Sequence, residues 1–334
     1  MERLGVVVHP TRRVLEAVEV IKRWTRERGV QLVQIVTGQQ PALAPPGEVG
    51  DGDLIVALGG DGTILKALHV SAAAKAPVLG VSYGSLGALT TVPAEELREG
   101  LGRFAAGDWR ARLLPALVVT VAGTRTATAI NDLVIARGRG TQLILDVCVD
   151  GELYVRTAGD GVVVATPLGS SGYSMAAGGS LLAEGADAFL CTPLAMHGGC
   201  APPLAVAGDA EVTVEVHPGH SGFFVDVDGF PVDTQAHRFA VAREPAYATL
   251  VALDDARAGF TRLRARGLIS DSPRVIGQAR LRTQLEHPPA PEGGRRGSDA
   301  GDHPSAGDPL AELERLQQPE PAQHPRAQRR HRQR

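Results

Sequence analysis

The segment LIVALGGDGTILKAL, residues 54–68, constrains the fold more than any other part of the chain. An uninterrupted apolar run leads into a glycine-rich turn, and a second largely apolar run follows at once. Continuous apolar runs bounded by turn residues are typical of strands buried in a parallel sheet. The segment therefore predicts a strand, a tight turn and a helix, which is the repeating unit of a sheet covered by helices.

The same alternation extends over the first third of the chain. It predicts further strands at residues 4–10, 30–36 and 77–82 and further helices at 11–29 and 93–108. For the helix at 11–29, Thr11 is the expected N-cap and Gly29 the expected C-cap. Strands and helices that alternate at short spacing favour a parallel sheet. We therefore expect an α/β N-terminal domain with a parallel sheet over residues 1–110.

Beyond residue 110 the chain becomes rich in short β-type runs with turn residues between them, such as QLILDVCVDGELYVRT and AEVTVEV. We expect residues 111–277 to form a mainly β, sandwich-like C-terminal domain with antiparallel strands. Residues 278–334 are rich in Pro, Gly, Gln, Arg and Asp. Such a segment has too little apolar surface to offset its ordering entropy, so we expect a disordered tail.

The composition narrows the class of protein. Only 4% of the residues are aromatic, so Val, Leu, Ile and Ala must build most of the core. The net charge of −3 and the pI of about 6.4 give no indication of a nucleic-acid or membrane partner. Three cysteines without paired metal-ligand spacing suit a reducing compartment. Because the sequence has no membrane-spanning run and no signal-peptide pattern, we expect a cytoplasmic protein.

Asp61 stands in the middle of the first glycine-rich turn, and this position indicates chemistry. Glycines at the carboxyl end of a parallel strand let a ligand approach the backbone, and the next helix points its first N–H groups at that ligand. A carboxylate there opposes phosphate binding unless it holds a metal ion or accepts a proton. Lys66, one turn into the helix, adds the positive charge that a phosphate requires. The alternatives are a purely structural turn and a solvent-facing lysine.

A second glycine-rich turn, GDGVVVATPLGSSGYSMAAGG at residues 159–179, has the same character. An apolar strand leads into a loop in which Ser170, Ser171 and Tyr173 offer hydroxyl groups suited to ribose or phosphate oxygens. Asp160 stands at the start of the strand, where a turn residue is the alternative.

Two other stretches complete the set of candidate loops. The predicted strand at 77–82 ends in a loop that contains Gly84 and Gly87. Asn131 and Asp132 are adjacent, so in a strand their side chains would face opposite ways. Both can address one ligand only if the chain bends there. His197 and Cys200 form a lone pair without a partner pair, which favours a loop over a metal site.

The segments GGDGT, GVSYGSLGALT, INDLVIARG, DGVVVATPLGSSGYSMAAGG and TPLAMHGG occur in the order found in NAD kinases, and the chain resembles that family from Leu4 to Leu268. The first segment alone is shared with lipid kinases of the diacylglycerol and sphingosine type, whereas the loop from Asp160 to Gly179 is far more specific. The resemblance implies an α/β domain, a β-sandwich-like domain and an active site between them. It also implies homodimers or homotetramers in which a second subunit completes the pocket.

The resemblance implies transfer of the terminal phosphoryl group of ATP, or of inorganic polyphosphate, to the 2′-hydroxyl of the adenosine ribose of NAD. Asp61 matches the catalytic Asp that accepts the hydroxyl proton. A divalent metal ion, in the first place Mg²⁺, would offset the charge of the donor, and no residue is assigned as its ligand. The positions that match nucleotide- and substrate-binding residues are Gly60, Gly62, Lys66, Asn131, Asp132, Asp160, Ser171, Gly172, Tyr173, Ser174 and Ala195.

The chain departs from the family pattern inside these segments. Leu168 and Ser171 replace two threonines, Gly172 replaces an alanine, Ser82 stands where Asn is common and Ala88 where Phe is common. These changes bear on substrate preference and leave the proton acceptor in place. Two alternatives stay open. One is a lipid or other small-alcohol kinase that shares only the first segment, and the other is a non-catalytic nucleotide-binding regulatory paralogue.

Overall fold

The computed structural model describes residues 1–12, 14–84, 87–139, 142–217, 222–253, 259–273 and 275. Met1–Leu268 form one compact unit, and Ile269–Arg334 are assigned to a second. The disordered tail predicted from residue 278 onward lies outside the described residues.

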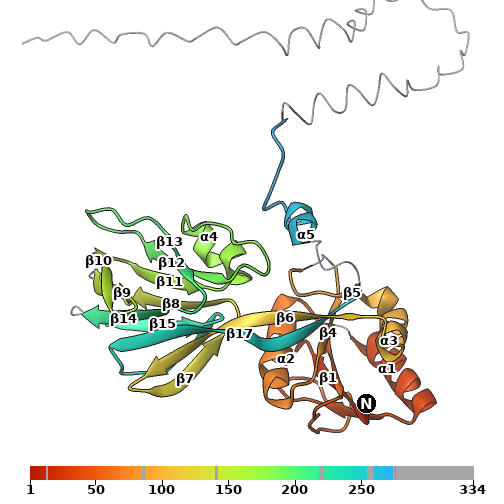
Figure 1. Cartoon of the computed structure of the whole chain (residues 1–334). Helices are drawn as coiled ribbons and strands as arrows, with labels where there is room; N and C mark the ends of the chain where they lie inside the picture. The colour runs from red at the N-terminus through yellow and green to blue at the C-terminus, as the bar shows by residue number, and fades with distance from the viewer. Residues whose placement is uncertain are drawn as a thin grey trace, which may run out of the picture. The chain divides into compact units, whose positions relative to one another are not determined.

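The first part of the chain is the expected α/β structure (Figure 1). Four parallel strands lie in the order β4-β3-β1-β2, with one helix between β1 and β2, another between β3 and β4, and a loop between β2 and β3. Their bounds are β1 Arg3–Val8, β2 Gln31–Gln34, β3 Leu54–Leu58, β4 Val78–Ser82, α1 Leu15–Arg28, α2 Asp61–Ala74 and α3 Leu97–Ala105, with a two-residue strand β5 Val92–Pro93 and a short 3₁₀ helix η1 Ala94–Glu96. Every residue of β3 and β4 is buried, which explains why these strands are apolar on both faces.

The ends of α1 confirm one prediction and correct another. Gly29 follows the helix in the left-handed region, with φ of 67°, as its C-cap role requires. The N-cap is Val14 and not Thr11. The backbone N–H groups of Thr11 and Arg12 both donate to Nδ1 of His9, at 3.2 Å each. The His9 side chain therefore holds this stretch in a turn and delays the start of the helix.

The second part of the chain is the expected antiparallel sandwich. It contains β6 Arg110–Val121, β7 Thr124–Ala129, β8 Asp132–Arg137, β9 Leu143–Val149, β10 Glu152–Gly159, β11 Gly161–Ala165, β12 Ala188–Leu194, β13 Leu204–Ala207, β14 Glu211–His217, β15 Phe223–Val227, β16 Phe230–Pro231 and β17 Arg238–Ala252. One sheet has the order β13-β12-β11-β8-β15-β16, and the facing strands include β10-β9-β14-β17. Buried aliphatic side chains fill the space between the sheets, with Phe189 and Phe239 as the large aromatic members.

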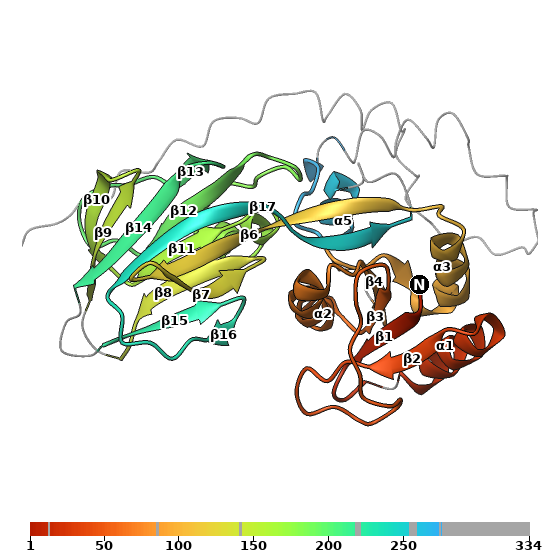
Figure 2. The ribbon, with the colours of Figure 1, turned by 60° about the horizontal axis from the view of Figure 1, so that its bottom comes forward.

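Two long strands connect the two parts (Figure 2). β6 and β17 run antiparallel to each other over nearly their whole length, with one irregularity between Glu244 and Ala248. The first half of β17 pairs with β14 of the sandwich, and Leu250 near its end pairs with Val78 of β4. The parallel sheet and one sandwich layer are thus a single continuous sheet. The loops at the junction carry the predicted site residues except Asp160 and Ala195.

Short helices complete the described part of the chain. They are η2 Gly169–Ser171, α4 Tyr173–Ala176 and α5 Gly259–Ala265. Among the described helices, none combines the length and the apolar character needed to cross a membrane.

Candidate active site

Asp61 is the first residue of α2 and directly follows the turn after β3. Its two carboxylate oxygens accept the backbone N–H groups of Ala88 and Leu89, at 2.9 and 3.0 Å. The carboxylate thus fastens the loop after β4 to the start of α2. Two of the loops singled out in the sequence meet at this residue.

The glycines around Asp61 fall into two groups. A Cβ atom on Gly87 would lie 2.0 Å from Oδ1 of Asp61, and one on Gly59 would lie 2.4 Å from Oγ1 of Thr63, so packing alone requires glycine at both positions. Gly60 and Gly62 are different. The nearest described atom to a Cβ on Gly60 is Nη2 of Arg12 at 3.8 Å, and no described atom lies within 4 Å of one on Gly62. Their backbone is open to a ligand.

A polar cleft of about 490 Å³ lies over these open glycines. Arg12 and Lys66 supply positive charge to its walls, and Phe230 of β16 closes one side. Nη1 of Arg12 donates to the carbonyl of Tyr83 at 2.7 Å, and Nζ of Lys66 lies 5.2 Å from the centre of the Phe230 ring. Burial, followed by the charges of Arg12 and Lys66, lowers the pKa of His9. The cleft combines two cations with a helix N-terminus, so it suits a phosphate chain.

The turn before β8 is organised by Asp228, a residue that the sequence analysis missed. Its carboxylate accepts the N–H groups of Ile130, Asn131 and Asp132, at 2.9, 2.6 and 3.2 Å. The Asp228 side chain is 1% exposed. The condition under which Asn131 and Asp132 could address one ligand is met in the backbone, because Asn131 lies in a bend outside any strand and Asp132 begins β8.

The sequence signal for Asp228 was a hairpin signal. Asp228 and Gly229 have φ of 53° and 77° between β15 and β16, as expected for an Asp-Gly pair in a tight hairpin. That pattern predicts the turn. It does not predict that the carboxylate of Asp228 bends back onto a segment 97 residues earlier in the chain.

The loop after β11 packs directly on the Asn131 turn. The carbonyl of Asn131 accepts the N–H of Thr166 at 2.9 Å, and a Cβ on Gly169 would lie 2.1 Å from the same oxygen. Burial, and secondarily the charge of Asp228, raises the pKa of Asp132 to about 6. The structure therefore brings Asn131 and Asp132 beside the start of the second glycine-rich loop.

Within that loop the hydroxyl groups differ in availability. Ser170 and Ser174 are fully buried and use their hydroxyls internally, Ser170 with the carbonyl of Pro167 and Ser174 with Thr192. The Ser171 hydroxyl donates to the carbonyl of Leu168 at 3.1 Å. Tyr173 is about half exposed. Ser174 therefore has a structural role here, and Tyr173 is the more accessible hydroxyl.

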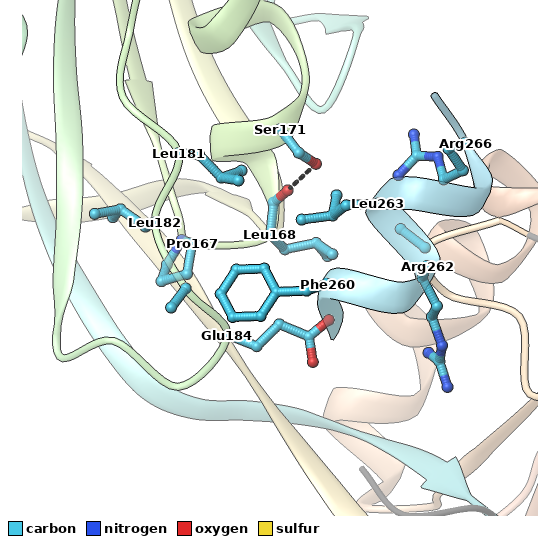
Figure 3. Close-up of a pocket in the computed structure, with 12 residues that line it drawn as sticks. Pro167, Leu168, Ser171, Leu181, Leu182, Glu184, Phe260, Arg262, Leu263 and Arg266 are labelled. Carbon is cyan, nitrogen blue, oxygen red and sulfur yellow. Dashed lines mark hydrogen bonds between the residues drawn. The ribbon is translucent and has the colours of Figure 1, made fainter. Parts of the chain in front are cut away.

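An apolar pocket of about 200 Å³ lies beside this loop (Figure 3). Leu168 and Ala88 line it from the two loops already described. Phe260 and Leu263 of α5 close it from the other side. Arg112 fixes the rim, because it donates to the carbonyl of Ala88 at 3.0 Å and to Glu184 at 2.7 Å. Since the N–H of Ala88 also holds Asp61, the pocket begins next to that carboxylate.

Asp160 and Ala195 lie elsewhere. Asp160 precedes β11 and pairs with Nε of Arg137 at 2.5 Å, whereas the Asn131 turn lies beside the far end of that five-residue strand. The strand is about 16 Å long. The N–H of Asp160 donates to Leu194, so Ala195 lies with Asp160. These two predicted residues are thus not brought to Asp61 within one chain.

Comparisons with known proteins agree with this architecture. The chain matches the family model of the ATP-NAD kinase N-terminal domain over residues 46–109 and that of the C-terminal domain over residues 130–238. It is 36% identical to the NAD kinase of Gemmatimonas aurantiaca over 222 residues, which are 64% of this chain and 76% of that protein. It is 33% identical to the NAD kinase of Moorella thermoacetica, over 69% of this chain and 77% of that one.

Two crystal structures share the fold. Yeast NADH kinase, solved with NADH, superposes with a TM-score of 0.67 and 23% identity, over 81% of this chain and 89% of that chain. An NAD kinase from Archaeoglobus fulgidus, solved with ATP, gives a TM-score of 0.61 and 22% identity, over 79% and 99%.

Proposed function

The chain belongs to the NAD kinase family, and from this membership we propose that it phosphorylates the 2′-hydroxyl of the adenosine ribose of NAD, with ATP or inorganic polyphosphate as donor. The observation that carries this proposal is the position of Asp61. Asp61 lines the polar cleft, and the loop that its carboxylate holds lines the apolar pocket. A carboxylate between a phosphate site and a ring-binding site is placed to take a proton from a hydroxyl that attacks phosphorus.

On the donor side, Arg12, Lys66 and the first N–H groups of α2 bind the phosphate chain and orient its terminal group toward Asp61. Among the described residues, no three His, Cys, Asp or Glu side chains cluster to form a metal cage. In proteins, Mg²⁺ is ordinarily bound by one or two carboxylates and by the phosphates of the substrate. The residues of the cleft therefore fit a Mg²⁺ ion that is bound mainly by the phosphates of ATP or polyphosphate. When bound, Mg²⁺ neutralises charge that develops during transfer.

On the acceptor side, the apolar pocket takes the adenine ring. Its volume of about 200 Å³ suits one ring system and not a whole dinucleotide. Asn131 and Asp132 bind the adjoining ribose, and Tyr173 offers the accessible hydroxyl at the loop. Asp61 then accepts the 2′-hydroxyl proton. Catalysis consists mainly of positioning and charge neutralisation, as expected for phosphoryl transfer.

The separation of Asp160 and Ala195 from Asp61 supports a shared site in a homodimer or homotetramer. In such an assembly these two residues would serve the site of a neighbouring subunit.

The cysteines Cys148, Cys191 and Cys200, all in the described part of the chain, are unpaired, which supports a cytoplasmic location.

The direct test is an assay for NADP formed from NAD and ATP with Mg²⁺. Formation of NADP at saturating substrates supports the proposal. Phosphorylation of a lipid or small alcohol without NADP formation would identify the first alternative. Binding of NAD without turnover would identify the regulatory paralogue.

The raised pKa of Asp132 predicts how acceptor binding depends on pH. The carboxylate gains its charge as the pH rises through about 6, and the charged form is the better acceptor for ribose hydroxyls. We therefore expect the KM for NAD to fall as the pH rises toward 6, by up to about tenfold per pH unit because one proton is involved. Steady-state assays from pH 5 to 8 measure this. Asp132→Asn should remove the inflection, and an unchanged inflection in that variant would assign the titration to another group.

The ring of Phe260 predicts a contribution to NAD affinity. Phe260→Ala removes one wall of the apolar pocket. A lost aromatic contact is worth about 0.5–1.5 kcal/mol, so the KM for NAD should rise about two- to tenfold with little change in kcat. Phe224→Ala on β15 is the matched control, because Phe224 is similarly exposed and lies outside this pocket. Equal KM values for NAD in both variants would remove Phe260 from the site.

A further inference from the structure

We propose that His69 is a positioning residue. It fixes the turn at Ile130–Asp132, which binds the ribose of NAD in the proposed function, relative to helix α2 and thereby relative to Asp61. The inference rests on the proposed function and adds a residue outside the segments that carry the family resemblance. Its basis is one continuous chain of contacts from α2 through Asp228 to Asn131 and Asp132.

The contacts converge on the buried carboxylate of Asp228. Nε2 of His69 lies 2.7 Å from Oδ2 of Asp228, the same oxygen that accepts the N–H of Ile130. The other oxygen of Asp228 accepts the N–H groups of Asn131 and Asp132. One carboxylate therefore joins a side chain of α2 to three successive amides of the turn. These hydrogen bonds form one bridge between α2 and the turn, with the buried Asp228 carboxylate at its centre; we call this bridge the bracket.

The second ring nitrogen of His69 also has a partner. Nδ1 lies 3.4 Å from the hydroxyl of Tyr247 on β17, and the two rings are 6.0 Å apart in an edge-on arrangement. Nε2 thus faces the Asp228 carboxylate and Nδ1 faces the Tyr247 hydroxyl. The ring is 28% exposed. The orientation of the ring is thus set by a partner at each nitrogen.

His69 and Asp61 lie on the same helix, so the bracket also connects Asp61 to the turn. Asp61 begins the helix, and His69 lies eight residues later, about 12 Å along the axis. A helix segment of this length moves as a rigid body. The contact between His69 and Asp228 therefore fixes the distance from Asp61, the proton acceptor, to Asn131 and Asp132, which bind the ribose in the proposed function. If His69 could not donate, the buried oxygen of Asp228 would lose a partner, and the hairpin and the Asn131 turn would shift together.

The test compares His69→Leu, which removes the donor, with His69→Gln, whose amide N–H retains one. We expect His69→Leu to lower kcat by about 10- to 100-fold, because a displacement of about 1 Å at a reacting centre has that effect. His69→Gln should recover activity to within a few-fold. His217→Leu controls for the loss of an exposed histidine ring elsewhere, and it should behave like the unaltered protein.

Hydrogen exchange is a second readout. It distinguishes a shift of the turn from a general loss of folded protein, and it does not depend on the proposed function. Hydrogen exchange should quicken at the Ile130–Asp132 amides in His69→Leu and not in His69→Gln. Unaltered exchange together with unaltered kcat in His69→Leu would overturn the inference. A melting temperature lowered equally in both variants, with kcat per folded molecule unchanged, would also overturn it. If the unaltered protein makes no NADP, the proposed function fails, and the exchange experiment still tests the bracket.

Discussion

Replacing Asp61 with Asn is expected to lower kcat by about 10²- to 10⁴-fold while NAD still binds. A ribose hydroxyl is a poor nucleophile at neutral pH, and a positioned base contributes a factor of this size. Asn has nearly the same shape but cannot take the proton. The side chains of Arg12, Lys66 and Asn131 are unchanged, so the main binding groups for both substrates remain. Steady-state kinetics and calorimetric titration with NAD measure the two effects separately.

The hydrogen bonds of Asp61 demand a control for this experiment. Each carboxylate oxygen accepts one backbone N–H, from Ala88 and from Leu89. The amide NH₂ of Asn cannot accept, so one of these contacts is lost and the loop can shift. Asp61→Ala loses both hydrogen bonds, so its stability and kinetics show how much of the effect comes from the loop and not from the missing base. If Asp61→Asn kept kcat within tenfold of the unaltered protein, Asp61 would be a loop anchor and the base would be another group.

Much of the fold was predictable because its signals are local. The buried strands β3 and β4 read as apolar runs, and Gly29 ends α1 where its backbone freedom is required. The start of α1 was predicted wrongly, since Thr11 resembles an N-cap in sequence. Its N–H is instead held by His9, a residue that offered no capping signal. Where a local propensity competes with a side chain that reaches back, the sequence pattern alone does not reveal which interaction prevails.

Some members of the candidate site could be singled out from the sequence, but its connections could not. Asp61 and Asn131 could be singled out because a glycine-rich turn and an Asn-Asp pair are unusual at the ends of strands. Asp228 could not, because its role depends on a contact across 97 residues. Phe260 could not either, since nothing in the local pattern of α5 indicates which pocket it closes. Such contacts follow from how β6 and β17 join the two parts of the molecule, and that arrangement is a property of the whole sheet.

Replacing Gly87 with Ala is also expected to lower kcat strongly, and the reason is the lack of space for a side chain. A Cβ at this position would lie 2.0 Å from Oδ1 and 2.6 Å from Cγ of Asp61. Ordinary contact requires a carboxylate displaced by about 1 Å or more. We expect Gly87→Ala to lower kcat at least about 10²-fold, because the base no longer meets the hydroxyl it must deprotonate. The hydrogen bonds from Ala88 and Leu89 to Asp61 would weaken at the same time, so the melting temperature should also fall.

A matched glycine separates this steric effect from a general effect of adding a methyl group. Gly102 lies inside α3, and no described atom is within 4 Å of where its Cβ would be. Gly102→Ala should therefore leave kcat unchanged and raise stability by about 0.5–1 kcal/mol, as expected for Gly to Ala in a helix. A crystal structure of Gly87→Ala should place the Asp61 carboxylate away from the N–H groups of Ala88 and Leu89. If Gly87→Ala instead retained full kcat with Asp61 displaced, the position of this carboxylate would be irrelevant to turnover, and its assignment as the proton acceptor would fail.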